Sequence, residues 1–137
     1  WGREIWIAWT KEYAGKILEL KKGHRFSLQY HEKKSETQFV AQGKVTYWFS
    51  KDGAMKKILK QKNRKPSSLA LKTLFPGDKI DFPPYTLHRA RALENSIIFE
   101  VSTPELNDVV KLDDDYGRSG KGNNEALDRK LAKHLSS

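Results

Sequence analysis

The sequence predicts an all-β protein whose short antiparallel strands form a sandwich or barrel, such as a jelly roll. Between residues 4 and 100, stretches rich in Val, Ile, Thr and aromatic residues alternate with turn signals that contain Gly, Pro, Asn or Asp. A chain of 137 residues is long enough for one domain with one hydrophobic core. These observations predict a single sheet-based core with little helix.

The predicted strands follow one another at short intervals along the first hundred residues. They occupy residues 5–9, 14–20, 25–31, 37–41, 44–50, 54–59, 69–74, 79–82, 87–93 and 96–101. One helix is predicted, at 124–135, with Asn123 or Asn124 as its N-cap. Because this helix is separate from the strands, we expect it to be an appendage or a mobile end.

The most informative pattern is the spacing of four metal-ligating side chains, Gln29, His31, Glu36 and His88. Gln29 and His31 are two residues apart in a predicted strand, so the alternation of side chains places both on one face. Glu36 follows a polar stretch that is short enough to be a hairpin loop. The four side chains supply two nitrogens, one neutral oxygen and one anionic oxygen, a donor set suited to Zn²⁺, Mn²⁺, Co²⁺ or Fe²⁺. We therefore expect a divalent metal ion inside the barrel.

The formal net charge of +9 raises nucleic acid, a membrane surface or an anionic small molecule as partners. Seven lysine and arginine residues fall between residues 51 and 65, and four more fall between residue 121 and the end of the chain. These clusters lack the interleaved aromatic residues on which bases stack. We interpret them as a solvated surface that discourages edge-to-edge pairing of sheets, and we do not expect a nucleic-acid partner.

The chain contains no cysteine, which excludes disulfide bonds and cysteine-ligated metals and fits a cytoplasmic protein. No apolar run approaches the roughly 18 residues of a membrane span, and no signal peptide is recognised. We expect a soluble, cytoplasmic protein with no membrane partner. Because the chain begins at Trp1 instead of Met, we also expect it to be part of a longer polypeptide.

Two groups of residues resemble the two sequence motifs of the cupin superfamily. The first group keeps the spacing of its motif, with Gln in place of the usual first His; it consists of Gly23, Gln29, His31, Glu36 and Gly43. The second group has Tyr where Gly is common, and Ala92 follows where Asn is common; it consists of Gly77, Pro83, Tyr85 and His88. Both departures in the second motif concern the shape of a turn more than metal coordination. The resemblance implies a cupin-like double-stranded β-helix.

Within the cupins, segments between Trp1 and Arg118 resemble the type II domain of mannose-6-phosphate isomerase. They are residues 1–2, 27–31, 34–36, 88–89, 108–111 and 115–118. The resemblance implies a cupin barrel domain at 1–118, followed by a basic C-terminal helix or tail at 119–137. It also implies a homodimer and a metal-dependent isomerase that interconverts an aldose and a ketose, as sugars or sugar phosphates, through an enediolate. Zinc-dependent members share the Gln, His, Glu and His ligand set, so zinc is the expected ion, with manganese, cobalt or iron as alternatives.

The resemblance also assigns roles to residues outside the ligand set. It points to Glu100 as the base that moves the carbon-bound proton, and to Lys111 as a second catalytic residue, where the family usually has Arg. Lysine keeps the charge of arginine but lacks its planar, two-pronged donor. Arg118 is the expected phosphate anchor because a guanidinium binds phosphate bidentately, with Ser27 and Lys34 as helpers in substrate binding.

Alternation along the strands makes two further predictions. If His88 faces the interior, Arg89 faces away from it, so Arg89 is left out of the site. Similarly, an apolar layer should lie opposite the polar side chains of residues 27, 29 and 31, and it is formed by Phe26, Leu28 and Tyr30. This layer must be covered, and the aromatic N-terminal segment 1–9 is the expected cover, within the chain or across a dimer.

Alternative functions remain open from the sequence. A cupin metal centre also supports oxygen-dependent cleavage, and the basic segments fit a non-catalytic module that binds sugar or nucleic acid. Each site residue also has a purely structural interpretation. The two histidines are then hydrogen-bonded core residues, Glu100 is a buried partner of a lysine, and the cations at 111 and 118 pair with the acidic run 113–115.

Overall fold

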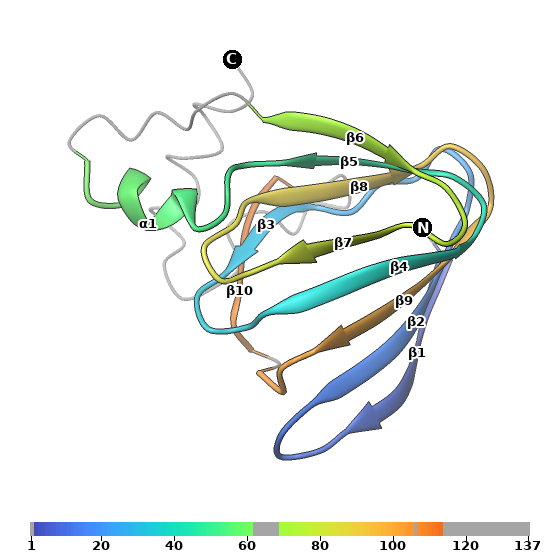
Figure 1. Ribbon diagram of the computed structural model, residues 1–137, viewed down its shortest axis with the longest axis horizontal. Coiled ribbons are helices and arrows are strands. Elements are labelled where there is room, and N and C mark those ends of the chain that lie inside the picture. The colour runs from blue at the N-terminus through green and yellow to red at the C-terminus, as the bar shows by residue number, and fades with distance from the viewer. Residues whose placement is uncertain (1, 62–68, 106, 114–137) are drawn as a thin grey trace.

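Two five-stranded antiparallel sheets face each other in the computed structural model of the protein (Figure 1). The structure describes residues 2–61, 69–105 and 107–113. The predicted helix at 124–135, the domain boundary after residue 118 and Arg118 itself lie outside the described residues. The prediction of an all-β sandwich of short antiparallel strands is confirmed.

Strands that follow one another in sequence mostly lie in different sheets. The first sheet has the order β1 (Gly2–Trp9), β2 (Ala14–Leu20), β9 (Ser96–Ser102), β4 (Glu36–Gln42) and β7 (Lys79–Phe82). The second sheet has the order β10 (Val109–Asp113), β3 (Leu28–His31), β8 (His88–Ala92), β5 (Val45–Phe49) and β6 (Ala70–Leu74). Most sheet neighbours therefore come from distant parts of the chain, as in a jelly roll.

The inward faces of the strands change from apolar to polar along their length. In β4 the buried positions are Glu36, Gln38 and Val40, and in β9 they include Ile98 and Glu100. The apolar positions form a core between the sheets; it consists of Leu18, Leu20, Val40, Val45, Tyr47, Leu74, Phe82, Ala90, Ala92 and Ile98. The polar positions continue the same faces toward one end of the sandwich, so the core leads directly into the site.

The prediction of a strand at 54–59 is wrong, because this segment forms the short helix α1 (Ala54–Ile58). Most of its residues are good helix formers, and Met55 and Ile58, three positions apart, are both buried on one side. They complete a second apolar cluster with Leu28, Tyr30, Leu87, Val110 and Leu112. Among the described residues, no helix has the length and apolar character needed to cross a membrane.

The predicted cover for the apolar layer is also corrected. Leu28 and Tyr30 are covered by α1 and by β10, a strand that the sequence analysis did not predict, and not by the N-terminal segment. In β1, Trp6, Ile7 and Trp9 are all exposed. Phe26 packs instead against the core between the sheets. The strand begins only at Leu28, so its alternation does not extend back to Phe26.

Two residues with left-handed backbone lie in turns that connect the two sheets, Gly43 between β4 and β5 and Tyr85 between β7 and β8. Gly43 has a φ of 89°, and a Cβ there would lie 2.2 Å from Ser96 Oγ, so only glycine fits. Tyr85 occupies the second-motif position where glycine is common and has a φ of 62°, which strains a residue with a side chain. Its N–H donates to the His31 carbonyl at 2.6 Å, and its ring stacks on Tyr30. These contacts hold the turn that precedes His88.

Candidate metal centre

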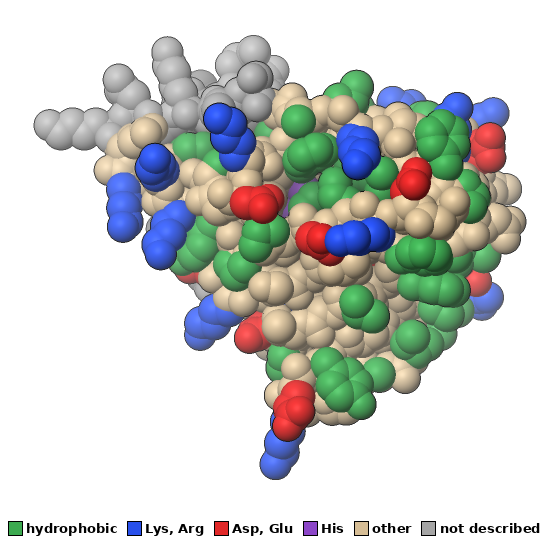
Figure 2. All heavy atoms as spheres, in the orientation of Figure 1, with side chains coloured by type: hydrophobic (Ala, Val, Ile, Leu, Met, Phe, Trp, Pro, Cys, Tyr) green, Lys and Arg blue, Asp and Glu red, His purple; other side chains and the backbone are tan. Residues whose placement is uncertain are grey.

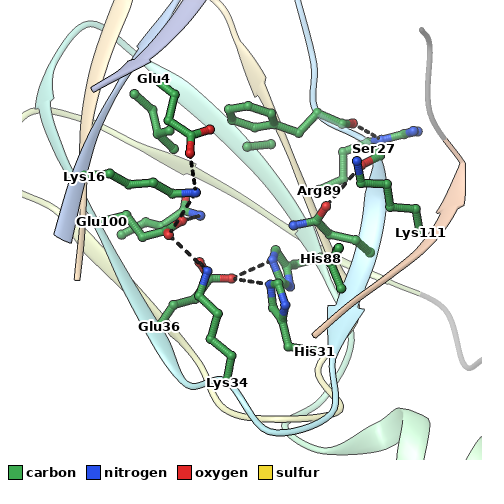
Figure 3. Close-up of a pocket in the computed structure, with 16 residues that line it drawn as sticks. Glu4, Lys16, Ser27, His31, Lys34, Glu36, His88, Arg89, Glu100 and Lys111 are labelled. Atoms are coloured by element: carbon green, nitrogen blue, oxygen red, sulfur yellow. Dashed lines mark hydrogen bonds and ion pairs between the residues drawn. The ribbon is translucent and has the colours of Figure 1, made fainter. Parts of the chain in front are cut away.

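His31, His88 and Glu36 meet at the polar end of the sandwich (Figure 3). His31 ends β3 and His88 begins β8, both in the second sheet, whereas Glu36 begins β4 in the first. The Nε2 atoms of His31 and His88 lie 3.3 Å and 3.0 Å from Glu36 Oε1. All three side chains are buried, and their potential ligand atoms lie within 4.8 Å of one another.

The outer nitrogen of each imidazole is held by a main-chain carbonyl. His31 Nδ1 lies 3.0 Å from the carbonyl oxygen of Asp108, and His88 Nδ1 lies 2.9 Å from that of Thr86. A carbonyl oxygen only accepts hydrogen bonds, so each Nδ1 carries the proton and donates it. Each Nε2 is thereby left with a lone pair that points toward Glu36.

The atoms at the centre are buried without hydrogen-bond partners: His31 Nε2, His88 Nε2 and Glu36 Oε1. Three acceptors that converge in this way repel one another unless a cation or a proton lies between them. Burial acts to raise the pKa of the Glu36 carboxyl, but when a proton lies on Nε2, hydrogen bonds and charge from the imidazoles outweigh burial and hold this pKa well below its ordinary value. The carboxylate therefore stays ionised, and the donor set fits a divalent metal ion.

Every predicted site residue that lies in the described ranges lines one cavity of about 190 Å³. These residues are Ser27, Gln29, His31, Lys34, Glu36, His88, Glu100 and Lys111. Gln29, the fourth predicted ligand, accepts a hydrogen bond from Ser27 Oγ at 3.1 Å through its Oε1. Lys111 pairs with Gln29 across β10 and β3. In the space-filling view, histidine atoms show inside a hollow between acidic and basic side chains (Figure 2).

A buried network of side chains surrounds Glu100 on the first sheet. Lys34 Nζ and Lys16 Nζ lie 3.3 Å and 3.5 Å from Glu100 Oε2. Gln38 Nε2 donates to Glu100 Oε1 at 3.2 Å, and Tyr47 donates to Gln38 Oε1 at 2.8 Å. Burial, followed by the nearby Glu36 carboxylate, raises the pKa of Glu100 to about 8. A carboxylate with this pKa is a stronger base than an ordinary glutamate.

Further residues line this cavity that the sequence analysis did not assign to the site, among them Gln38, Lys16 and Arg89. Gln38 is two positions from Glu36 on the same strand, so alternation alone was enough to place it inside. Lys16 lies on the same inward face of β2 as Leu18 and Leu20, because the three residues are spaced two apart. This spacing was a second signal in the sequence that could have placed Lys16 in the cavity. Arg89 was predicted to face away from the interior because it neighbours His88 in the strand, and this prediction of its position is wrong. Its side chain is buried and lines the cavity, where Nε donates to the Phe26 carbonyl at 2.8 Å beside the irregular segment 25–27.

Comparison with solved structures identifies the fold. KdgF from Halomonas sp. matches with a TM-score of 0.60 and 20% sequence identity, over 76% of this chain and 79% of that one. An RmlC-like cupin from Shewanella frigidimarina matches with a TM-score of 0.57 and 16% identity, over 74% and 75% of the two chains. A protein from Acidithiobacillus ferrooxidans, described as a proposed sugar phosphate isomerase, matches with a TM-score of 0.52 and 16% identity, over 72% of this chain and 53% of that one.

The protein thus has the cupin fold, a double-stranded β-helix, with a buried His, Glu and His cluster in its cavity. No family model matches the chain, and no curated protein matches its sequence. At identities of 20% or less, the structural matches establish the fold, and the reaction has to be argued from the site.

Proposed function

We propose that this protein is a metal-dependent isomerase that interconverts an aldose and a ketose, as a sugar or a sugar phosphate, in the manner of mannose-6-phosphate isomerase. One observation carries the proposal: three converging, unpartnered ligand atoms lie beside Glu100, a buried carboxylate with a raised pKa. The Acidithiobacillus protein shares the fold, and its description as a sugar phosphate isomerase agrees with the reaction that we propose from the site.

His31, His88 and Glu36 are the proposed ligands, with Gln29 as the fourth through its amide oxygen. Their mixture of nitrogen and oxygen donors suits Zn²⁺ first, with Mn²⁺, Co²⁺ or Fe²⁺ as alternatives. When bound, a divalent ion supplies Lewis-acid chemistry, polarising the substrate carbonyl and stabilising the negative oxygen that develops.

Glu100 is the proposed base for the carbon-bound proton. Both of its oxygens have partners, Oε1 the Gln38 amide and Oε2 the Lys34 ammonium. We propose that Oε2 accepts the proton from C2 of the aldose when Lys34 turns from it to the substrate. The electrons of the broken C–H bond form the C1–C2 double bond of an enediolate with its negative charge on O1. The C2 hydroxyl proton then passes to O1, and Glu100 returns its proton to C1, which leaves the carbonyl at C2 of the ketose. Lys34 Nζ, 3.3 Å from Oε2, favours the ionised form of Glu100 that the first transfer requires.

Substrate binding is proposed for the cationic and hydroxyl groups that line the cavity. Lys34 and Ser27 lie on opposite sides of it, and Lys111 lies beside Ser27 (Figure 3). Lys111 is proposed to act on the substrate during catalysis, and Arg118 remains a proposed phosphate anchor. Together these groups favour a polyhydroxy substrate that carries an anionic substituent.

The proposal is tested with protein purified without chelators. Its metal content is measured first, and the metal-loaded protein is then incubated with aldoses and aldose phosphates in D₂O. We expect aldose–ketose interconversion with solvent deuterium incorporated at the carbon that receives the proton, observed by NMR. Failure to convert any member of the panel, with metal bound, contradicts the isomerase.

A second candidate function is favoured by the same cluster, because two histidines and one carboxylate are also the donor set of many non-haem iron oxygenases. Oxygen-dependent cleavage requires iron and consumes O₂, whereas isomerisation requires neither. Measuring turnover with and without oxygen separates the two: activity under strict anaerobiosis excludes the oxygenase, and strict dependence on O₂ excludes the isomerase.

We also propose that the protein forms a homodimer through the outer face of the first sheet. A row of apolar residues crosses four neighbouring strands there, formed by Ile5, Ile17, Phe99 and Phe39. The rings of Phe39 and Phe99 stack with 6.2 Å between centroids and are 38% and 41% exposed. Apolar side chains aligned across neighbouring strands favour a sheet face that a second copy of the chain covers. Phe99→Lys should therefore yield monomers in sedimentation analysis, and a monomeric wild type contradicts the dimer.

A further inference from the structure

Asp108 belongs to one of the segments that resemble the isomerase domain, yet the proposed chemistry gives it no role. It lies immediately before β10 and is only 8% exposed. A buried aspartate needs partners for its charge. The structure supplies them from the loop between β3 and β4.

The carboxylate of Asp108 accepts three successive main-chain hydrogen bonds. Its Oδ1 accepts from Glu32 N at 3.1 Å, and its Oδ2 accepts from Lys33 N at 2.5 Å and from Lys34 N at 2.8 Å. The next amide in the loop, that of Ser35, donates to Thr103 Oγ1. Every amide of residues 32–35 is thereby paired with a side chain, and three of the four are paired with Asp108.

This loop joins two of the metal-ligating residues. His31 is the last residue of β3 in the second sheet, and Glu36 is the first residue of β4 in the first sheet. The conformation of the loop therefore governs how the two ligands approach each other across the cavity. Lys34, which reaches Glu100, also belongs to the loop.

Asp108 acts on His31 a second time through its main chain. Its carbonyl oxygen lies 3.0 Å from His31 Nδ1 and keeps the proton on that nitrogen. One residue therefore fixes the path of the chain after His31 with its side chain and the tautomer of His31 with its carbonyl. Partners of this kind, beyond the direct ligands, orient the ligands and raise metal affinity.

We propose that Asp108 is a positioning residue for the metal centre, holding the loop at 32–35 and the His31 imidazole in the geometry that binds the ion. This inference rests on the metal site of the proposed function but not on the reaction that follows. Asparagine at this position retains one oxygen acceptor and places an amide N–H₂ against main-chain donors. Alanine retains none.

The first test measures metal affinity, without reference to activity. Asp108→Asn should weaken Zn²⁺ and Mn²⁺ binding by about 10- to 100-fold in calorimetric titrations, and Asp108→Ala should weaken it further. Asp78→Asn is the matched control, because Asp78 Oδ2 accepts a single hydrogen bond from Phe75 N in an exposed turn away from the cavity. The control should bind metal as the wild type does. Wild-type affinity in both Asp108 variants overturns the proposal.

The second test reads the histidine tautomers by nitrogen NMR. Asp108→Ala keeps the carbonyl of residue 108 but removes the side chain that anchors it to the 32–35 loop. We therefore expect His31 to lose its single Nδ1–H tautomer while His88, held by Thr86, keeps its own. A general loss of stability affects both rings equally and therefore speaks against a positioning role.

A third measurement needs no variant. If Asp108 couples the loop to the centre, metal binding should slow hydrogen exchange at the amides of Glu32, Lys33 and Lys34, since coupling between two sites is reciprocal. Unchanged exchange at these amides overturns the proposal. Failure of the isomerase appears separately, as absence of turnover in a protein whose affinity and tautomers behave as expected.

Discussion

The two walls of the cavity contribute opposite chemistry and hold their side chains in opposite ways (Figure 3). The second sheet provides His31 and His88, and each imidazole is fixed by a main-chain carbonyl. The first sheet provides Glu36 and Glu100, whose surroundings are other side chains, above all Lys34 and Gln38. In the imidazole wall, formed by His31 and His88, the path of the backbone fixes the orientation of the side chains. In the carboxylate wall, formed by Glu36 and Glu100, the identity of the neighbouring side chains fixes it.

This difference separates the tasks that we propose for each wall. Main-chain carbonyls persist whatever residue occupies their position, so the imidazoles keep a constant geometry for the ion as long as the backbone keeps its path. The side chains around Glu100 tune its charge. Burial and Glu36 raise its pKa, while Lys34 and Lys16 lower it. Substitutions in the carboxylate wall should accordingly change the reaction more than they change metal binding.

Loss of a ligand should have the largest effect and should also separate the walls. Glu36→Gln and His88→Ala should both reduce metal affinity by more than the roughly 100-fold expected for residues beyond the ligands. In chelator, however, Glu36→Gln should change the stability of the fold by less than about 1 kcal/mol, because the new amide can donate to an Nε2 and so offsets the lost attraction between the carboxylate and the imidazoles.

His88→Ala should instead destabilise the fold in chelator by roughly 2–4 kcal/mol, because it removes a ring stacked on Phe82 and leaves a void. Calorimetric titration and urea unfolding measure the two properties. Equal stability changes in Glu36→Gln and His88→Ala contradict the distinction between the walls.

Glu100→Gln should come next in magnitude. We expect kcat to fall by about 10²- to 10⁴-fold, the usual contribution of a general base. Metal affinity should change little, because the amide has the shape of the carboxylate and Glu100 is not a proposed ligand. Turnover and exchange of the C2 proton with solvent are measured together. Proton exchange at the wild-type rate in this variant removes Glu100 from the mechanism.

Tyr47→Phe should lower kcat by roughly tenfold and leave KM unchanged. Its hydroxyl orients the Gln38 amide, which in turn occupies Glu100 Oε1. We expect a larger primary isotope effect with substrate deuterated at C2, because proton transfer becomes slower relative to other steps. A double-mutant cycle with Gln38→Leu should be non-additive. Additive effects indicate that the two residues act independently.

The smallest effects should lie at the outer end of the carboxylate wall. Lys16→Met should lower kcat a few-fold, because it removes a cation 3.5 Å from Glu100 Oε2. Glu4→Gln should change kcat by less than about twofold, since the partly exposed Glu4–Lys16 pair is screened by solvent. Measuring kcat of the two variants at low and high salt checks that the effect decreases from Lys16 to Glu4. A larger fall in kcat for Glu4→Gln than for Lys16→Met contradicts this order.

Local patterns in the sequence predicted much of this arrangement. Strands from 14–20 to 96–101 appear near their predicted positions, apart from 54–59. The spacing of Gln29, His31 and Glu36 placed these residues in one cavity because alternation in a strand and the length of a hairpin loop are local properties.

The failures lie where local patterns end. Residues 54–59 contain too few residues to show a helical period clearly, and their helix is selected by the apolar surface of β3 and β10 that Met55 and Ile58 cover. Arg89 enters the cavity lining because segment 25–27 leaves the regular strand. The alternation rule holds only within a regular strand, so it cannot predict where a chain leaves that geometry.

By itself, the sequence determined the class of fold, the ligand residue types and the face of the strand that carries them, because side-chain chemistry and backbone periodicity are local. Only the tertiary structure decided which atoms converge. Asp108 reaches the 32–35 loop, Tyr47 reaches Gln38, and His88 meets Glu36, because two sheets built from distant segments pack face to face. Burial there removes the water that otherwise satisfies these groups, and it leaves three lone pairs directed at one point.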